Sequence, residues 1–174
     1  MAETAQQYID RILGNIEGQD ALKVQKLTAG KLQKLIRGLS PRQLRWQPAP
    51  GKWSIAEILA HLADVEIVAS WRLRSVIASS GVTIQPFNQD VWASVFQYNK
   101  RDAKRSLELF RFLRENNLEM LKNVPAAAWE NYGMHLERGK ETLAHLSRMF
   151  AGHDTNHVLQ VEGIAAYFRK KRNK

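Results

Sequence analysis

Apolar residues recur three and four positions apart along most of this chain, which is the spacing of one face of an α-helix. Only 10 glycines and 5 prolines interrupt the pattern over 174 residues, and the alternation typical of a strand is hard to find. The sequence therefore predicts helices and no sheet. Four main helices are expected at about 19–38, 54–79, 100–123 and 142–168, with a weak amphipathic segment at about 4–15 that leads into the first of them and a short helix near 89–97.

The connections between the main helices differ in length, which predicts an all-α, antiparallel four-helix bundle with short extra helices in its connections. Metal and cofactor sites in such bundles are made by side chains on facing helices. The clearest boundary is the sequence Ser54-Ile55-Ala56-Glu57, a capping box that starts the second main helix. Because the chain contains no repeat or low-complexity tract, residues 1–174 are expected to form one domain.

The chain has no cysteine, which excludes disulfide bonds and thiolate metal ligands. Any transition-metal site must then consist of imidazole, carboxylate and water. A net charge of +9 raises the question of nucleic-acid binding, but lysines and arginines are spread over the exposed positions of several helices. The one dense basic run, residues 169–174, is expected to be a solvated tail that ends a helix, and nucleic acid is not the expected partner.

The first twenty residues lack the basic start, the apolar stretch and the cleavage site of a secretory signal. No segment has the roughly 18 uninterrupted apolar residues that are needed to cross a membrane. The protein is therefore expected to be cytoplasmic and not to bind membranes.

Three of the five histidines lie on the apolar faces of predicted helices. His153 and His157 are four residues apart, so their rings project from one helix face about a turn apart and continue an apolar stripe toward the core. His61 has apolar neighbours on its own face of the second main helix. One inward histidine is usually a core residue, but three on two helices that share a core predict the ligands of one divalent metal ion with an open position.

Two polar residues are candidates for a supporting or substrate-binding role. Glu57 lies one turn before His61 and could hold the second nitrogen of that ring, unless the capping box occupies the carboxylate. Gln160 lies three residues after His157 and is a candidate for orienting a bound water or a substrate.

The other polar residues near these positions fit a metal site less well. Asp64 and Asp154 lie farther round their helices, where a general-base role stays an open alternative. His145 is roughly 80° round the helix from His153 and about 12 Å away along it. His135 lies in the irregular segment after the third main helix. Both of these histidines are expected to be structural or surface residues.

Four segments, taken in order, carry a resemblance to a known family. The sequence resembles the DinB/YfiT-like superfamily from about Leu22 to Val161, and the resemblance implies a four-helix bundle of unusual connectivity. The segments are Trp53–Glu66, Phe87–Ala93, Gly139–Leu143 and Gly152–Val161.

The resemblance implies that His61, His153 and His157 hold one divalent transition metal ion, which is zinc, nickel or iron in different members. Many members have a histidine where this chain has Asn156, and this difference puts a substrate-contact role at that position in doubt. Characterised relatives include metal-dependent hydrolases and transferases that activate low-molecular-weight thiols, so a small-molecule substrate is implied. A homodimer is implied as well, and apolar residues expected to be exposed at 81–99 agree with it.

Three functions stay open, in the order in which the residues favour them. The first is a metal-dependent enzyme, either a thiol S-transferase or a hydrolase, whose ion lowers the pKa of a water or of a substrate thiol. The second is a non-catalytic, metal-stabilised helical scaffold or small-molecule binder. The third is nucleic-acid binding, which would require a one-sided patch of lysine and arginine. No residue pattern identifies the substrate or the physiological metal.

Overall fold

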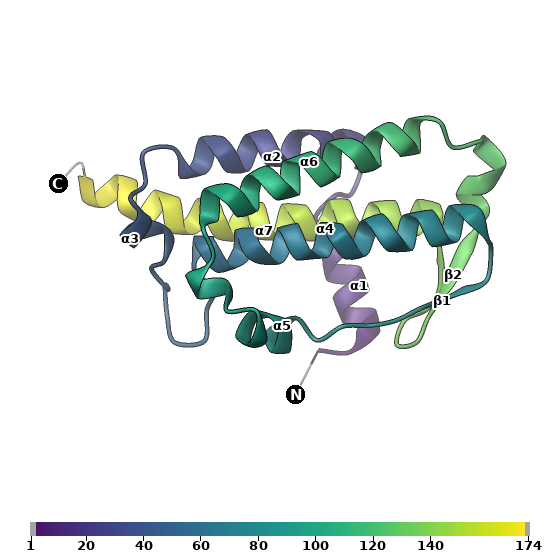
Figure 1. Cartoon of the computed structure of the whole chain (residues 1–174), viewed down its shortest axis with the longest axis horizontal. Helices are drawn as coiled ribbons and strands as arrows, with labels where there is room; N and C mark the ends of the chain where they lie inside the picture. Colours follow the sequence, from purple (N-terminus) through teal and green to yellow (C-terminus); the bar gives the residue numbers. More distant parts are fainter. Residues whose placement is uncertain (1–2, 173–174) are drawn as a thin grey trace.

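The computed structural model describes residues 3–172. Its four long helices form a four-helix bundle (Figure 1), in which α4 packs against α6 and α7, and α2 packs against the same two helices. The predicted all-α four-helix bundle is confirmed, although α4 and α6 run parallel to each other, and each predicted main helix lies within a few residues of its observed bounds. These bounds are α2 (Ala21–Ile36), α4 (Ile55–Ala78), α6 (Ala103–Lys122) and α7 (Leu143–Arg172).

The connections between the main helices determine the direction in which each helix runs through the bundle. After α4 ends, a long connection returns along the bundle, so that α6 runs parallel to its neighbour α4 (Figure 1). This connection contains β1 (Val82–Ile84), α5 (Gln89–Val95) and the 3-10 helix η1 (Tyr98–Lys100). Helix α1 precedes the bundle and packs against α7. The remaining short elements are α1 (Ala5–Gly14), α3 (Pro41–Leu44) and the 3-10 helix η2 (Ala126–Glu130).

Capping residues explain where the two site-bearing helices begin. Ser54 Oγ accepts a hydrogen bond from the backbone N–H of Glu57, and the Glu57 carboxylate accepts one from the backbone N–H of Ser54 at 2.7 Å. This is the predicted capping box at the start of α4. At the start of α7, Thr142 Oγ1 accepts a hydrogen bond from the backbone N–H of His145. These hydrogen bonds therefore fix the residue at which each of the two helices begins.

The expectation that the chain has no sheet is wrong. β1, β2 (Tyr132–His135) and β3 (Gly139–Thr142) form a small sheet of order β1-β2-β3 near one end of the bundle (Figure 1). β1 pairs with β2 in parallel, and β2 pairs with β3 antiparallel. Strands of three or four residues are too short for an alternating pattern to be recognised in the sequence. The sheet joins the long connection to the hairpin that precedes α7.

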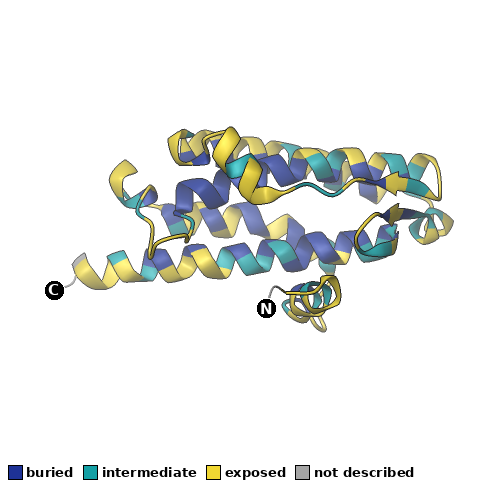
Figure 2. Ribbon diagram, turned by 90° about the horizontal axis from the view of Figure 1, so that it is seen from below, coloured by how far each residue is buried: buried dark blue, intermediate teal, exposed yellow. Residues whose placement is uncertain are grey.

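The helices bury their inner faces and expose their outer faces (Figure 2). Two apolar clusters follow one another along α4, and the boundary between them lies between Ala63 and Val65. Along α7, the buried apolar residues of one cluster end at Phe150, and those of the other begin at Val161. A polar layer that includes His61, Asp154 and His157 is buried between these clusters.

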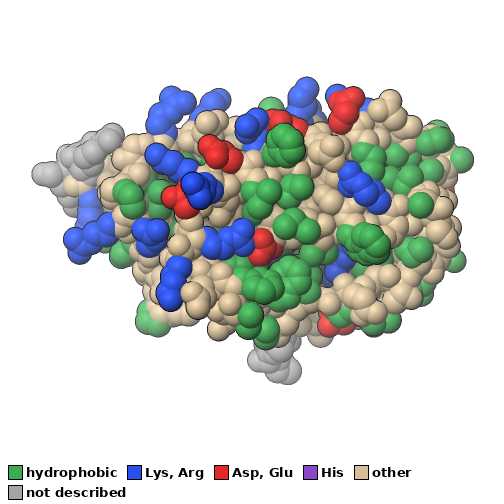
Figure 3. Space-filling view, viewed as in Figure 1, with side chains coloured by type: hydrophobic (Ala, Val, Ile, Leu, Met, Phe, Trp, Pro, Cys, Tyr) green, Lys and Arg blue, Asp and Glu red, His purple; other side chains and the backbone are tan. Residues whose placement is uncertain are grey.

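The described part of the basic C-terminal segment is exposed and forms the end of α7. Helix α7 continues to Arg172, so the helix does not end at 168, and residues 173–174 lie outside the described residues. Arg169 donates hydrogen bonds to the carbonyls of Lys34 and Leu35 at the end of α2. On the face shown in Figure 3, lysine and arginine side chains are distributed with acidic side chains among them. Within the described chain, no helix has the length and apolar character to span a membrane.

Candidate metal centre

His61 of α4 meets His153 and His157 of α7 inside the bundle, where these two helices are neighbours. The Nε2 atom of His153 lies 3.0 Å from Nε2 of His61 and 3.1 Å from Nε2 of His157. One ring nitrogen of each residue lies within 4.8 Å of the other two. The structure thus brings together the three residues predicted as ligands, and we call them the histidine cluster.

The geometry of the histidine cluster fits a divalent metal ion. Two nitrogens bound to one ion at about 2.1 Å and at a tetrahedral angle lie about 3.4 Å apart, which is close to both observed distances. Hydrogen bonding satisfies the cluster less well, because a proton on Nε2 of His153 points at only one neighbour at a time. An ion accepts a lone pair from each ring. The Nδ1 atoms of His61 and His153 have no hydrogen-bond partner among the described residues.

Burial keeps the three imidazoles neutral. It lowers the pKa of His61 and of His153 well below the usual histidine value, and His157 lowers both further through charge repulsion. Burial also lowers the pKa of His157 to about 4. A metal ion binds neutral imidazole, so the cluster needs no deprotonation step near neutral pH.

Gln160 orients one ring of the cluster. Its Oε1 atom lies 2.8 Å from Nδ1 of His157, and a carbonyl oxygen can only accept a hydrogen bond. Nδ1 of His157 therefore carries the proton, and the lone pair on Nε2 faces the other two histidines. The sequence predicted Gln160 as a residue that orients water or substrate, whereas the structure shows it orienting a ring of the cluster.

The structure places Glu57 in the capping box and not behind His61. Its carboxylate accepts hydrogen bonds from Ser54 Oγ at 2.7 Å and from Gln47 Nε2 at 3.1 Å. Nδ1 of His61 has no partner in the described part of the chain. Of the two interpretations of Glu57, the structure supports the one in which the cap occupies it.

The two aspartates considered as general bases form ion pairs elsewhere. Asp64 accepts hydrogen bonds from the Tyr98 hydroxyl at 2.9 Å and from Arg101 at 2.8 Å. Asp154 pairs with the buried guanidinium of Arg114. Both carboxylates are engaged by these partners, so a general-base role is not supported for either.

The two remaining histidines, which were expected to be structural or surface residues, lie outside the cluster, and His135 is buried. His145 lies 4.0 Å from the carboxylate of Glu141. His135 is only 2% exposed, in β2, and it lines a small cavity together with His61 and His153. The sequence did not indicate this position because the strand that carries His135 was not predicted.

A cavity of about 740 Å³ lies beside the cluster and has an aromatic wall. The rings of Trp46 and Tyr167 stack in this wall with their centroids 4.7 Å apart. The ring of Trp53 lies 4.8 Å from the ring of His61, measured between centroids. A concave space that combines aromatic walls with convergent polar groups is typical of a small-molecule site.

Helix α1 closes part of this cavity, which sequence reasoning missed. Tyr8 and Arg11 of α1 line the cavity, and Arg11 donates a hydrogen bond to Oδ1 of Asn156 at 3.2 Å. The pattern of residues 4–15 predicted an amphipathic segment, but it contained no signal for where the segment would dock. Asn156 therefore contacts α1 at the edge of the site.

The chain is similar to a known protein family and to several named proteins. The family model described as the DinB superfamily matches residues 26–161. An Oceanobacillus iheyensis protein named "Putative metal-dependent hydrolase" is 24% identical over 133 residues, which cover 76% of this chain and 77% of that protein. A protein of the same description from Geobacillus kaustophilus is 25% identical over 134 residues, covering 76% and 75%.

A solved structure shares the fold. It is described as "YfiT from Bacillus subtilis is a probable metal-dependent hydrolase with an unusual four-helix bundle topology", and it superposes with a TM-score of 0.79 at 17% identity over 85% of each chain. In this chain α4 runs parallel to its neighbour α6, and α2 runs parallel to its neighbour α7 (Figure 1). The family model covers α4 and the part of α7 that carries His153 and His157, and the chain belongs to the DinB superfamily.

Proposed function

We propose that this protein is a metal-dependent hydrolase of a small molecule, with one divalent transition metal ion held by His61, His153 and His157. The observation that carries the proposal is the convergence of three imidazole nitrogens beside a cavity of about 740 Å³. Three protein ligands leave a coordination position open, as in catalytic sites, whereas structural sites normally have four. The names of the relatives support the reaction class.

Residues of this chain bind the substrate, orient the histidine ligands and exclude water from the site. A bound divalent ion supplies Lewis acidity, which polarises a substrate carbonyl or phosphoryl group and lowers the pKa of a water. Gln160 holds the Nδ1 proton of His157 and so keeps the Nε2 lone pair directed at the centre of the cluster. Trp53 covers the ring of His61 and excludes water from that side. The stacked rings of Trp46 and Tyr167 offer an apolar surface for the body of the substrate.

Transfer of a low-molecular-weight thiol is the finer alternative that the family resemblance implies. The two reactions differ in their nucleophile, which is water in one and a substrate thiol in the other. Because the chain has no cysteine, a thiol would have to come with the substrate. Assays of esters, amides and phosphoesters, with and without bacillithiol, distinguish the two reactions by their products.

The metal centre is tested by elemental analysis of untagged protein. We expect about one equivalent of zinc, nickel or iron in the wild type and a sharp loss in His61→Ala, His153→Ala and His157→Ala, since each variant removes one of three ligands. His145→Ala is the matched control, because His145 lies on α7 outside the cluster, and it should retain the metal. Equal metal content in His153→Ala and the wild type would contradict the proposal.

A second measurement separates the enzyme from a metal-stabilised scaffold. The wild type is freed of metal with a chelator, reconstituted with each of the three metals, and assayed on the same substrate panel. An enzyme loses turnover with the metal and regains it on reconstitution. A scaffold shows only a lower unfolding temperature without metal, and that result would contradict the proposal of a hydrolase.

A further inference from the structure

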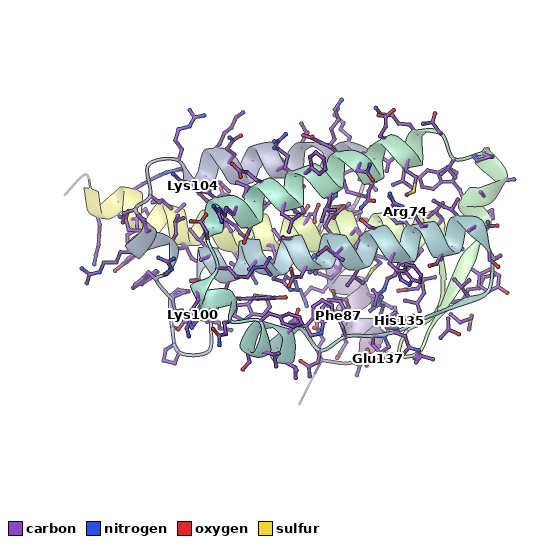
Figure 4. All side chains as sticks on the ribbon, in the orientation of Figure 1. Arg74, Phe87, Lys100, Lys104, His135 and Glu137 are labelled. Atoms are coloured by element: carbon purple, nitrogen blue, oxygen red, sulfur yellow. The ribbon has the colours of Figure 1, made fainter. Side chains whose placement is uncertain are left out.

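A second, smaller cavity of about 250 Å³ adjoins the histidine cluster. His61 and His153 form part of its wall, and the rest comes from α1, α4, the long connection, the β2–β3 hairpin and α7. Phe87, His135 and Glu137 lie together on this side of α4 (Figure 4). The cavity is smaller than the roughly 300–1,000 Å³ of sites for whole ligands, so its size fits one functional group.

The small cavity contains a guanidinium group without a counter-ion. Arg72 is 8% exposed, and it donates one hydrogen bond, to the backbone carbonyl of Gln85. No carboxylate forms an ion pair with Arg72 within residues 3–172, and its remaining N–H groups have no protein partner there. Burial lowers the pKa of Arg72 to about 10, so the side chain still carries its charge near neutral pH. The guanidinium lies 5.9 Å from the centroid of the Phe87 ring, and a charge so largely removed from water is costly unless an anion or ordered water accompanies it.

His135 adds a second donor to the same wall. The backbone N–H of Glu137 donates a hydrogen bond to Nδ1 of His135 at 3.2 Å, so Nδ1 is the acceptor nitrogen. Burial lowers the pKa of His135 to about 4, which leaves the ring neutral with its proton on Nε2. That Nε2–H group has no partner among the described residues. Two donors on one cavity wall therefore lack an acceptor.

Two acidic residues lie near the cavity, but neither forms an ion pair with Arg72 in the described part of the chain. Arg138 is neutralised by the buried carboxylate of Glu141, with which it makes hydrogen bonds of 2.7 and 3.1 Å. Glu137 also borders the cavity, but its side chain is exposed and therefore screened by solvent. Arg72 therefore has no carboxylate at ion-pair distance among residues 3–172, and the charge of Glu141 acts on it only from farther away.

We propose that the small cavity binds an oxyanion, a carboxylate or phosphate group of the substrate, with Arg72 as its ion-pair anchor and His135 as a hydrogen-bond donor. Tyr8, Gln89 and His153 belong to the walls of both cavities, so the two spaces adjoin at the histidine cluster. A substrate with an anionic group at one end and an apolar body would then place the bond between them beside the cluster. This assignment of substrate class rests on the proposed function, whereas the binding of an anion does not depend on the metal.

The test uses protein freed of metal with a chelator, so that an added anion has no ion to bind. Inorganic phosphate and acetate are titrated separately, at constant ionic strength, while ¹H–¹⁵N spectra follow the arginine Nε–H and backbone amide signals. We expect saturable shifts at Arg72 and at residues 133–138. The affinity should fall about tenfold in Arg72→Gln, because a charged hydrogen-bond partner is lost. His135→Phe should weaken binding by a smaller factor.

Arg74→Gln is the matched control, since Arg74 lies on the same helix but on the other side of it (Figure 4), hydrogen-bonded to Asn117 and Asn116. Its affinity should equal that of the wild type.

Preference for phosphate or for acetate identifies which oxyanion the substrate carries. Unsaturable shifts spread over surface lysines, or equal affinity in folded Arg72→Gln, would overturn the proposal. If Arg72→Gln does not fold, the location of the shifts in the wild type decides. Metal content is measured separately, so a failure of the metal centre stays distinguishable from this result.

Discussion

Gln160 is the residue whose substitution most directly tests how the histidine cluster is oriented. Its side-chain oxygen holds the Nδ1 proton of His157 at 2.8 Å, while the residue itself is exposed, so the fold should survive its replacement. We expect Gln160→Ala to weaken metal binding by about 10- to 100-fold, as loss of a partner behind a ligand does. Competition with a chromophoric chelator measures the change. Glu162→Ala, at an exposed position of the same helix, should leave the affinity unchanged, and equal affinities in both variants would contradict the role of Gln160.

Among individual residues, the sequence predicted those whose side-chain direction follows from helical spacing. His153 and His157 share a face because they are four residues apart, and His61 has the same inward direction on α4. The spacing did not indicate whether Glu57 would bond to its own helix cap or to a ring. Nor did it indicate His135 or Arg72, because their shared cavity depends on the pairing of β1 with β2, which are far apart in sequence.

Among the elements, the docking of α1 on α7 depends on the absence of a side chain at Gly152. A Cβ atom built there would fall against the backbone carbonyl of Ile12 in α1, which cannot move without the helix. We expect Gly152→Ala to displace α1 and to destabilise the protein by about 1–3 kcal/mol, the usual range for overpacking. Urea unfolding measures the loss, and weakened protection of the α1 amides from hydrogen exchange locates it.

Gly163 is the matched control for this prediction. It is also a helical glycine of α7, but a Cβ atom there would meet nothing within 4 Å. Gly163→Ala should therefore stabilise the protein by about 0.5–1 kcal/mol, because alanine loses less backbone entropy in a helix. A destabilisation of the same size in both variants would show that the cost comes from the helix itself and not from contact with α1.

The sequence predicted the main helices but not the strands, and the reason is physical. Helices α2, α4, α6 and α7 have apolar stripes of several turns and capping residues such as Ser54, so local sequence determines them. The strands have three or four residues each, and their pairing partners lie about fifty residues apart or across a short hairpin. Nothing local distinguishes such a segment from an irregular connection.

Across the whole molecule, a buried ionic network holds three helices of the bundle together. Arg114 of α6 pairs with Glu66 of α4 at 2.6 Å and with Asp154 of α7, and all three residues are nearly inaccessible to solvent. We expect Arg114→Met to destabilise the protein by about 3–5 kcal/mol, because it leaves two buried carboxylates without a counter-charge. Urea unfolding of metal-free protein measures the change without a contribution from the histidine cluster.

Arg111→Met is the control for the network. Arg111 lies on the same helix in an exposed pair with Glu115, and such pairs contribute about 0.5 kcal/mol or less. Similar losses in the two variants would mean that the buried network does not stabilise the bundle. The network was not predictable from sequence, because its members come from three helices whose relative register only the folded structure defines.

Exposed apolar side chains on the outer surface offer an interface for the expected homodimer. Exposed apolar side chains lie on α5, where Val91 is 52% and Val95 is 65% exposed, and on the neighbouring α4, where Trp71 is 75% exposed. Figure 3 shows hydrophobic side chains in the middle and lower part of the face that carries α4 and α5. Association through this face would bury them, since contiguous exposed apolar surface commonly marks an interface.

We therefore expect light scattering to give the mass of a dimer for the wild type and of a monomer for Val95→Asp, because a carboxylate placed in an apolar interface has no partner there. Phe112→Asp is the matched control, since Phe112 is 70% exposed on α6, away from α5. It should leave the dimer intact if α5 forms the interface. A monomer mass for the wild type at high protein concentration would remove the dimer, and dissociation by Phe112→Asp alone would move the interface to α6.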